Sequence, residues 1–397
     1  MTKPTIRFRG FDDEWEQRKL GEVLKERSER ANGSEELLSV TIGNGVIKQA
    51  DSDKRNTASD DKSNYKIVRK GDLPYNSMRM WQGAVGNSEY DGIVSPAYTV
   101  LVPTEEANSK FFMELFKKES TLQIFQRWSQ GLTSDTWNLK YPALSTIQFY
   151  IPSVFEQTKI ADYFIQLDHL ITLHQRKCDE TKKLKKYMLQ KMFPQNGNKV
   201  PEIRFKGFTD EWEQRKLGEI ALQTYGGGTP KTANEEFWKG NIPWIQSSDL
   251  IEERLFNVKP RKYISQEAIS KSATKLVPQN SIAIVTRVGV GKLAFMPFSY
   301  ATSQDFLSLS ELKIEPEFAV YALYKMMQLV SNEVQGTSIK GITKDELLAK
   351  EILIPDCEEQ KKIGAYLHTL DSLITLHQHK CEEIKKLKKF MLQNMFI

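Results

Sequence analysis

Two long segments of the chain, 151–193 and 354–396, carry apolar residues at helical spacing. These residues are Ile160, Phe164, Leu167, Ile171, Cys178 and Met188 in the first segment, and Ile363, Leu367, Leu370, Ile374, Cys381 and Met391 in the second. Their spacing is typical of a coiled-coil seam. Ser153 and Asp356 each stand directly after a Pro and three residues before a Glu, which is the spacing of a capping box. We therefore predict one long helix in each segment.

The two helical segments belong to a larger internal repeat. Residues Ile6–Val23 return as Ile203–Ile220, and only three of the 18 positions differ. Leu170–Cys178 likewise returns as Leu373–Cys381 with one difference. Residues 24–148 and 221–351, which lie between the shared segments, show no comparable identity. The chain therefore contains two copies of one framework, and each copy carries a different variable domain.

The order of these segments predicts an antiparallel helix pair. A helix of roughly 38 residues is about 57 Å long. The second variable domain follows the end of the first helix and precedes the start of the second. Parallel helices would force this domain to bridge the whole helix length, whereas antiparallel helices bring its two attachment points together. The alternative is a helix packed on a single globular core.

We expect an α+β protein in which two globular domains are joined by two long helices in an antiparallel coiled coil with pseudo-two-fold symmetry. The predicted first domain spans residues 1–150, and the first spacer helix with its linker spans 151–199. The second domain then spans residues 200–351, and the second spacer helix spans 352–397.

The variable domains combine apolar runs with polar loops. We predict strands at Tyr65–Tyr75 and Tyr98–Pro103, and a helix at Lys110–Gln130. The second domain has an apolar run at Ser281–Val285. The loops carry donor, acceptor and stacking side chains of the kinds that contact base edges and phosphates. The candidate DNA-binding residues are Asn76, Ser77, Arg79, Trp81, Thr133, Ser134 and Lys140 in the first domain, and Thr229, Lys231, Arg287, Lys292, Ser338 and Lys340 in the second. Ordinary surface loops, with Trp81 and Trp137 anchored in the core, are the alternative.

Composition places the chain among ordinary globular proteins, with 40% hydrophobic and 27% charged residues. It has no apolar run of about 18 residues and no apolar signal peptide, so we expect neither membrane insertion nor secretion. Three cysteines are too few for a disulfide framework, which favours a cytoplasmic location. The net charge of +5, from 56 basic and 51 acidic residues, does not by itself indicate nucleic-acid binding.

Two motifs resemble catalytic sequences but lack required residues. Thr286–Lys292 is similar to a phosphate loop, yet Thr286 replaces its first glycine and Leu293 replaces the Ser or Thr that binds magnesium. Pro355–Lys361 contains the Pro-Asp and Glu-x-Lys elements of a nuclease, but its acidic residues are too close together and the first copy has Ser153 there. We therefore predict no catalytic residues in this chain.

Two further sets of residues repeat on the helices. His174 and Cys178 share a helix face, as do His377 and Cys381, so four zinc ligands would meet if the helices crossed there; packed seam residues are the commoner explanation, and we predict no metal site. Matched basic clusters follow at Lys182, Lys183, Lys185 and Lys186, and at Lys385, Lys386, Lys388 and Lys389. They fit a solvated face near a helix C-terminus, or a surface that contacts DNA phosphates or acidic partner helices.

Several motifs occur along both the shared segments and the second variable domain. They are Trp212–Glu219, Ile242–Gln246, Arg287–Lys292, Thr302–Phe306, and Ile151-Pro152 followed by Glu156–Ile160 and Leu167-Asp168. With these motifs the chain resembles the specificity subunits of type I restriction-modification systems. The first copy has the same frame, so the resemblance covers essentially the whole chain. The first domain lacks an evident counterpart of Gly228-Thr229-Pro230, and DNA contacts are therefore not transferred loop by loop between the halves.

The resemblance implies two target-recognition domains that each contact one half of a bipartite site in double-stranded DNA, with the helical spacer setting the gap. It also implies a chain that is not catalytic and holds no cofactor of its own. Two modification subunits would supply S-adenosylmethionine and methylate adenine, and restriction subunits would use ATP and Mg for translocation and cleavage. The sequence has no Asn-Pro-Pro-Tyr-type methyltransferase motif and no helicase motif, which agrees with that division. The alternatives are a structural adaptor that binds proteins and a self-sufficient DNA enzyme.

Overall fold

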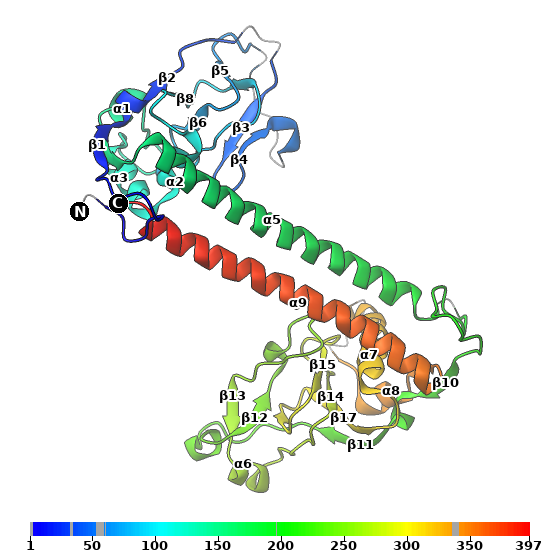
Figure 1. The fold of residues 1–397 in the computed structure, drawn as a ribbon. Coiled ribbons are helices and arrows are strands. Elements are labelled where there is room, and N and C mark those ends of the chain that lie inside the picture. Colours follow the sequence, from blue (N-terminus) through cyan, green and yellow to red (C-terminus); the bar gives the residue numbers. More distant parts are fainter. Residues whose placement is uncertain (1–2, 32–34, 53–58, 60, 196, 336–340) are drawn as a thin grey trace. The chain divides into compact units, whose positions relative to one another are not determined.

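The computed structural model describes residues 3–31, 35–52, 59, 61–195, 197–335 and 341–397. It contains two compact units: Met1–Gln175 with Gln378–Ile397 is unit 1, and Arg176–His377 is unit 2. Each unit holds one variable domain and part of both long helices (Figure 1). The four segments that we predict follow the repeat boundaries instead, and that division stays a prediction.

The two predicted long helices are α5 (Val154–Lys191) and α9 (Cys357–Asn394). Each begins one residue after its predicted N-cap: the Ser153 hydroxyl accepts from the Glu156 backbone N–H (3.5 Å), and the Asp356 carboxylate accepts from that of Glu359 (3.1 Å). The reciprocal half of the predicted capping box is replaced, because the Glu156 and Glu359 carboxylates bind arginines instead.

Within each unit the two helices pair antiparallel, as predicted. In unit 1, the Cys381 sulfur lies 4.0 Å from the Ile171 carbonyl oxygen, while the ring of Phe396, just beyond the end of α9, lies 5.7 Å from that of Phe164, earlier on α5. Unit 2 shows the same opposition: Cys178 contacts the Ile374 carbonyl oxygen at 4.0 Å, and the later Lys185 contacts the earlier Asp371. The chain is therefore an α+β protein with an antiparallel helical spacer.

The globular part of unit 1 consists of short antiparallel strands and small helices. Strand β8 is the middle strand of a sheet with β2 and β6, while β3 pairs with β4, β5 with β7, and β1 with β9. The elements are β1 (Glu16–Lys19), α1 (Leu20–Val23), β2 (Leu24–Glu26), β3 (Leu38–Thr41), β4 (Gly45–Lys48), β5 (Lys66–Val68), β6 (Leu73–Asn76), β7 (Gly92–Val94), β8 (Tyr98–Pro103), α2 (Ser109–Lys117), α3 (Glu119–Trp128), α4 (Tyr141–Leu144) and β9 (Gln148–Ile151).

Two of the predicted elements are divided in unit 1. The predicted strand at Tyr65–Tyr75 is β5 and β6, because the chain turns between them at Gly71, which has a φ of +91°. The predicted helix at Lys110–Gln130 is α2 and α3, because the backbone at Lys118 is extended (φ −63°, ψ 135°). The predicted strand Tyr98–Pro103 is confirmed as β8.

Unit 2 is built around a four-stranded antiparallel sheet in the order β11-β17-β14-β15, and a second sheet has the order β13-β12-β16. The elements are β10 (Glu213–Lys216), β11 (Ala221–Gly226), β12 (Ile242–Ile245), β13 (Lys262–Ile264), α6 (Gln266–Lys271), β14 (Ser281–Val285), β15 (Leu293–Met296), β16 (Ala301–Thr302), β17 (Phe306–Leu312), α7 (Pro316–Gln335), α8 (Lys344–Ala349) and β18 (Glu351–Ile354). The apolar run Ser281–Val285 forms β14.

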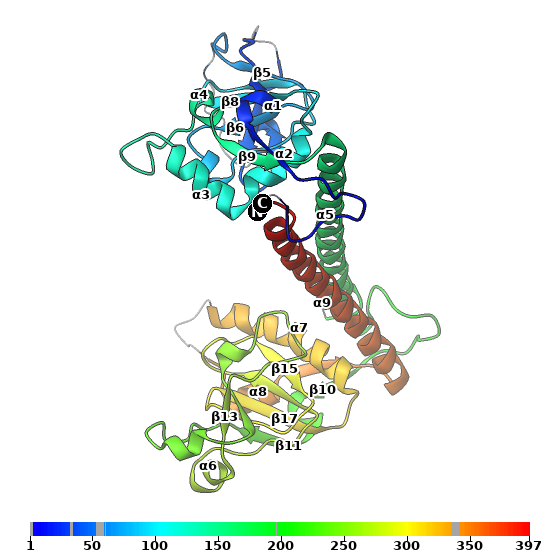
Figure 2. The same ribbon diagram turned by 60° about the vertical axis from the view of Figure 1, so that its left-hand side comes forward.

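Strand β14 is buried on both faces, because side chains alternate across a strand. Ile282 and Ile284 belong to the core that includes α7 and α9, whereas Ala283 and Val285 belong to a second core with Ile245 of β12. Figure 2 shows α7 crossing one side of this sheet. The main sheet therefore lies between the helices and the layer that contains β12.

The repeated segment Ile6–Val23, which returns as Ile203–Ile220 and which we call the box, closes each globular part with an equivalent strand pair. Strand β1 pairs antiparallel with β9, and β10 pairs with β18, so the box is hydrogen-bonded to the strand that leads into the long helix. The Trp of each box, Trp15 or Trp212, is buried in the core of its own unit. The motif that carries the family resemblance thus has a structural role.

An arginine from each box then holds the start of the spacer helix. Arg7 forms two hydrogen bonds of 2.7 Å with Glu156 in unit 1, and Arg204 forms equivalent bonds of 2.7 and 2.8 Å with Glu359 in unit 2. The glutamine that follows each Glu is also buried. Gln360 donates to the Pro355 carbonyl oxygen (2.8 Å) and accepts from a backbone N–H just before α7, and Gln157 makes the equivalent contacts before α2.

The residues directly after each long helix complete the core of one unit. Phe396 lies against Phe111 in unit 1, with ring centroids 5.2 Å apart, and Phe193 stacks on Phe318 in unit 2 at 5.6 Å. A lysine of each globular part caps the adjacent carbonyl oxygen: Lys118 donates to Phe396 at 2.9 Å and Lys325 to Phe193 at 3.2 Å. Burial lowers the pKa of both lysines, that of Lys325 to about 8.

Candidate nucleic-acid interface

In unit 1, two loops meet beyond the end of β6. The backbone carbonyl of Ser77 accepts from the Leu139 N–H (2.9 Å), and the buried Tyr75 hydroxyl donates to the Leu139 carbonyl (3.0 Å). The indole rings of Trp81 and Trp137 pack edge to face, with centroids 5.2 Å apart. These contacts join loops 76–82 and 130–140 into one surface, which we call the first reading edge.

Most of the candidate DNA-binding residues of unit 1 are accessible to solvent on the first reading edge. Thr133, Ser134 and Lys140 are exposed, whereas Asn76, Arg79 and Trp81 are half-buried. Arg79 has no ion-pair partner among the residues that the structure describes. Ser77 is the exception, because it is buried and its hydroxyl is bonded to Thr99 (2.9 Å). The structure therefore argues against a direct DNA contact by Ser77.

The half-buried Trp81 is neither a fully exposed DNA-contacting side chain nor a fully buried core anchor, which were the two interpretations of the sequence. Its indole N–H donates to the Met78 carbonyl (3.2 Å), and its ring packs on Trp137, so the pair stabilises the loops. Neither ring is fully buried, which leaves part of each aromatic surface for a ligand.

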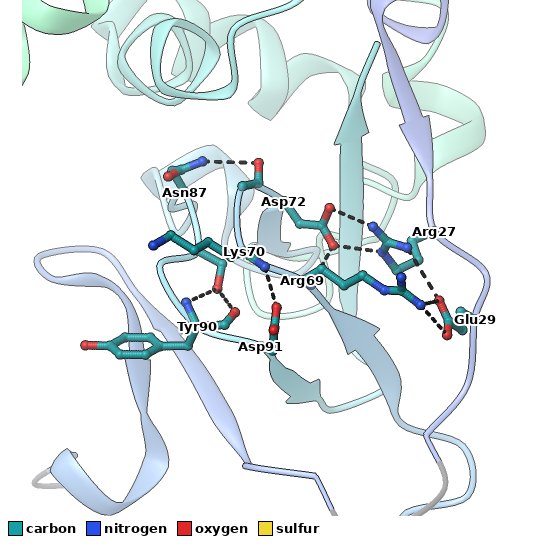
Figure 3. Close-up of polar contacts among 10 residues, drawn as sticks. Arg27, Glu29, Arg69, Lys70, Asp72, Asn87, Tyr90 and Asp91 are labelled. Carbon is teal, nitrogen blue, oxygen red and sulfur yellow. Dashed lines mark hydrogen bonds and ion pairs between the residues drawn. The ribbon is translucent and has the colours of Figure 1, made fainter. Parts of the chain in front are cut away.

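A charged network anchors the strand that carries the first reading edge (Figure 3). Asp72, just before β6, receives two hydrogen bonds from Arg27 (2.8 and 2.9 Å) and a third from the Arg69 backbone N–H (2.8 Å). Glu29 contacts both Arg27 (3.4 Å) and Arg69 (2.9 Å). Because the Asp72 side chain is only 4% exposed, this network holds the start of β6 and thereby positions Asn76 at its end.

In unit 2, several strand ends meet at a second edge. The Gly228 N–H donates to the Thr302 carbonyl (2.8 Å), the Ser303 N–H to the Ile245 carbonyl (2.9 Å), and the Thr286 N–H to the Asp305 carbonyl (2.8 Å). A Cβ atom on Gly227 would lie 1.8 Å from the Ser303 oxygen, so only glycine permits this approach. The loops 226–231, 246–249, 286–292 and 302–305 form what we call the second reading edge.

Four predicted residues lie on the second reading edge. Thr229, Lys231 and Arg287 are exposed, and Lys292 is half-buried. The Thr229 hydroxyl donates to the Gln304 side-chain oxygen at 2.6 Å, which links two of the loops. Ser338 and Lys340 lie outside the described residues. The next residues, Gly341 and Ile342, run beside Thr286, whose carbonyl accepts from the Ile342 N–H (2.9 Å).

Our residue-based prediction missed two glutamines on this edge. Gln304 is exposed beside Thr229, and Gln246 is half-buried at the start of its loop. Glutamine can donate and accept together, as recognition of an adenine edge requires. Both residues lie within motifs that carry the family resemblance, Ile242–Gln246 and Thr302–Phe306, which was the available signal.

The loop that resembles a phosphate loop has the wrong structural context for one. Residues 286–292 connect the antiparallel strands β14 and β15, whereas a phosphate loop leads from a strand into a helix. Arg287 and Lys292 are therefore presented by a hairpin, which leaves them suited to groove or backbone contacts.

The repeated cysteines are buried in the helix seam and form no disulfide. Cys178 faces the Ile374 carbonyl oxygen, and Cys381 faces that of Ile171. Within the described part of the chain, no group of three or more His, Cys, Asp or Glu side chains is arranged to hold a metal ion. Packing explains both cysteines.

The matched lysine clusters are not uniform. Lys182, Lys183 and Lys186 are exposed, as are Lys385, Lys386 and Lys389. Lys185 and Lys388 instead form ion pairs inside their units, at 2.6 Å to Asp371 and 2.7 Å to Asp168. These two lysines therefore do not belong to the predicted solvated or DNA-contacting faces, because their charges are neutralised within the protein.

A repeated scaffold that carries two different polar edges is the architecture of a two-site recognition protein. The comparison with known families agrees with this class. A model described as type I restriction modification DNA specificity domain matches residues 12–183 and 209–386, so each match covers one variable domain and most of the helix that follows it. The chain belongs to this family.

Relatives with known names support the same assignment. The chain is 28% identical over 194 residues to the type I restriction enzyme MjaIX specificity subunit of Methanocaldococcus jannaschii, which covers 47% of this chain and 44% of that protein. It is 32% identical over 182 residues to the EcoR124I/EcoR124II specificity subunit of Escherichia coli, covering 43% of each. These matches span less than half the length of either relative.

The fold is shared with a solved specificity subunit. The crystal structure of the type I restriction-modification S subunit from M. genitalium superposes with a TM-score of 0.64 over 100% of this chain and 99% of that one, at 13% identity. None of the helices in the described part of the chain has the length and apolar character of a membrane span.

Proposed function

We propose that this chain is the DNA specificity subunit of a type I restriction-modification complex and that each unit contacts one half of a bipartite site. One observation carries this proposal: both units have the same scaffold contacts but different reading edges. The Arg7–Glu156 pair recurs as Arg204–Glu359, while the loops at the two edges share no comparable sequence. A duplicated scaffold with divergent loops suits recognition of two different half-sites.

The chemistry of the edges suits duplex DNA. Arg79 and Lys140 on the first edge, and Lys231, Arg287 and Lys292 on the second, supply cations for phosphates or guanine edges. Asn76, Gln246 and Gln304 supply amides that both donate and accept hydrogen bonds. Each recognition domain then needs only moderate affinity for its half-site. Once one domain is bound, the spacer raises the effective concentration of the other domain at the second half-site.

We propose that the helices set the gap between half-sites and present equivalent surfaces to two copies of one modification subunit. The helix segments of both units expose a matched set of four large apolar side chains, and the two sets correspond residue for residue in the repeat. They are Leu170, Leu173, Leu387 and Phe390 in unit 1, and Leu373, Leu376, Leu184 and Tyr187 in unit 2. Unit 1 also exposes Val154 and Phe155, which have no apolar counterpart in the second copy. Exposed apolar side chains favour burial against a partner, and a repeated set favours a partner present twice.

In this proposal the chain performs no catalysis and carries no cofactor. Modification subunits supply S-adenosylmethionine and the adenine methyltransferase activity. Restriction subunits supply ATP- and Mg-dependent translocation and cleavage. The contribution of this chain is to place those activities on the correct DNA sequence.

The test is single-molecule mapping of methylated adenines in DNA from cells that express this chain together with its modification subunit. A split motif should appear that is absent when the modification subunit is expressed alone. Replacing residues 24–148 with those of a relative should change one half-site and leave the other and the gap unchanged. No new methylation from a purified, stable complex would contradict DNA recognition and favour an adaptor that binds proteins.

A further inference from the structure

One lysine in each basic cluster turns away from solvent toward the opposite helix. Lys185 of α5 has a side chain that is 8% exposed, and its ammonium group lies 2.6 Å from Asp371 of α9. Lys388 of α9 makes the equivalent contact in unit 1, with both carboxylate oxygens of Asp168 of α5 within 2.8 Å. Each pair therefore joins the two spacer helices.

Each ion pair also includes a group from the adjacent recognition domain. In unit 2, the Tyr321 hydroxyl of α7 donates to the second oxygen of Asp371 at 2.6 Å. Burial, together with the charge of Asp371, raises the pKa of this hydroxyl, so it remains a donor. In unit 1, the buried Glu114 of α2 lies 3.2 Å from Lys388. Both clusters thus connect α5, α9 and a domain helix at one point.

The sequence provides each lysine with a single acidic partner over a long stretch of the opposite helix. Asp371 is the only acidic residue between Glu359 and Glu382, and Asp168 is the only one between Asp162 and Asp179. A shift of one heptad preserves an apolar seam, but it would bring Gly364 or Gln378 to the position of Asp371. The buried ammonium group would then lose its counter-charge, which is unfavourable in a seam.

We propose that Lys185 and Lys388 are positioning residues that hold the spacer helices in one register, seat each recognition domain on them, and so restrict the complex to one gap length. This inference rests on the proposed function, because a gap has meaning only if both units contact DNA. The neighbouring Lys182 lies on the same helix but is exposed, so it provides a matched control.

The experiment is methylation mapping with the complete complex, on DNA in which the two half-sites are separated by the native gap or by one base pair more or less. Lys185→Met should keep both half-sites but lower the preference for the native gap by about tenfold, and Lys388→Met should do the same. Lys185→Arg, which retains the charge, should restore the preference. Lys182→Met should leave it unchanged.

A purely structural role would lower the stability or yield of the complex without changing gap preference. Thermal unfolding of each variant complex therefore accompanies the mapping. Tyr321→Phe provides a milder change that keeps the ion pair, and it should also widen the range of accepted gaps. If the wild-type complex produced no split motif, the proposed function would fail. If it produced one motif with one gap, and folded Lys185→Met and Tyr321→Phe complexes kept that selectivity, the positioning role would be refuted.

Discussion

The contact between the repeated box and the spacer helix predicts a large and specific loss of stability in unit 2. The Glu359 side chain is 0% exposed and that of Arg204 is 11% exposed, and two hydrogen bonds of 2.7 and 2.8 Å join them. Arg204→Met keeps most of the apolar stem but leaves a carboxylate buried without its counter-charge. We expect this substitution to lower the free energy of unfolding by about 4 kcal/mol, since breaking one side of a buried ion pair typically costs about 3–5 kcal/mol.

The hydrogen bonds lead to a similar magnitude. A bond to a charged group contributes about 1.5–3 kcal/mol, so the loss of two corresponds to about 3–6 kcal/mol. With a urea dependence of about 2 kcal/mol per M, a loss of about 4 kcal/mol moves the unfolding midpoint by about 2 M. Urea unfolding followed by hydrogen-exchange mass spectrometry assigns the loss to one unit. Arg7→Met is the matched variant for unit 1, because Arg7 contacts Glu156 in the same way.

The double variant Arg204→Met/Glu359→Met separates the cost of an orphaned charge from the value of the pair. Replacing both partners with apolar residues is often neutral or stabilising, so the double variant should recover most of the stability that the single variant loses. A loss below about 1 kcal/mol for Arg204→Met, or a double variant less stable than the single, would refute the reasoning.

Three further predictions can be checked separately. Lys325 has a pKa of about 8 in the folded chain against 10.5 for an ordinary lysine, so the unfolded state binds more protons than the folded state between those pH values. The free energy of unfolding of the wild type, relative to that of Lys325→Met, should therefore rise from pH 8 to pH 10.5. Urea titrations that give the same difference at every pH would contradict this prediction. Phe396→Ala should destabilise unit 1 by about 3–5 kcal/mol, and Phe193→Ala should destabilise unit 2 by a similar amount, because the two rings belong to separate cores. If either variant increased hydrogen exchange in both units, this assignment to separate cores would be wrong. Arg287→Ala should weaken binding of duplex DNA by the assembled complex about tenfold or more, and it should affect one half-site only. Arg215→Ala, in strand β10, should leave this binding unchanged. Equal effects of the two variants in filter-binding assays would exclude a specific role for Arg287.

Several features of the recognition edges were inaccessible to sequence analysis. Ser77 and Asn76 are adjacent polar residues in one loop, yet Ser77 is buried against Thr99 and Asn76 is half-buried at the edge. Gln304 belongs to the second edge because its segment packs beside the glycine loop 226–231, a contact across more than 70 residues of chain. Local composition does not predict such long-range contacts, because they depend on which strand ends pack together.

The long helices, the duplicated framework and the antiparallel direction follow from the amino-acid sequence alone, because helical periodicity, repetition and chain connectivity can be obtained without the fold. The sequence also predicted β8 with its observed bounds. The partners of the charged residues, in contrast, depend on how the chain folds. Glu156 has the spacing of a capping box but binds Arg7, and Lys185 has the pattern of a solvated face but binds Asp371. Those partners lie 149 and 186 residues away in the sequence. Tertiary packing brings them within hydrogen-bond distance, and a local sequence pattern cannot predict such a contact.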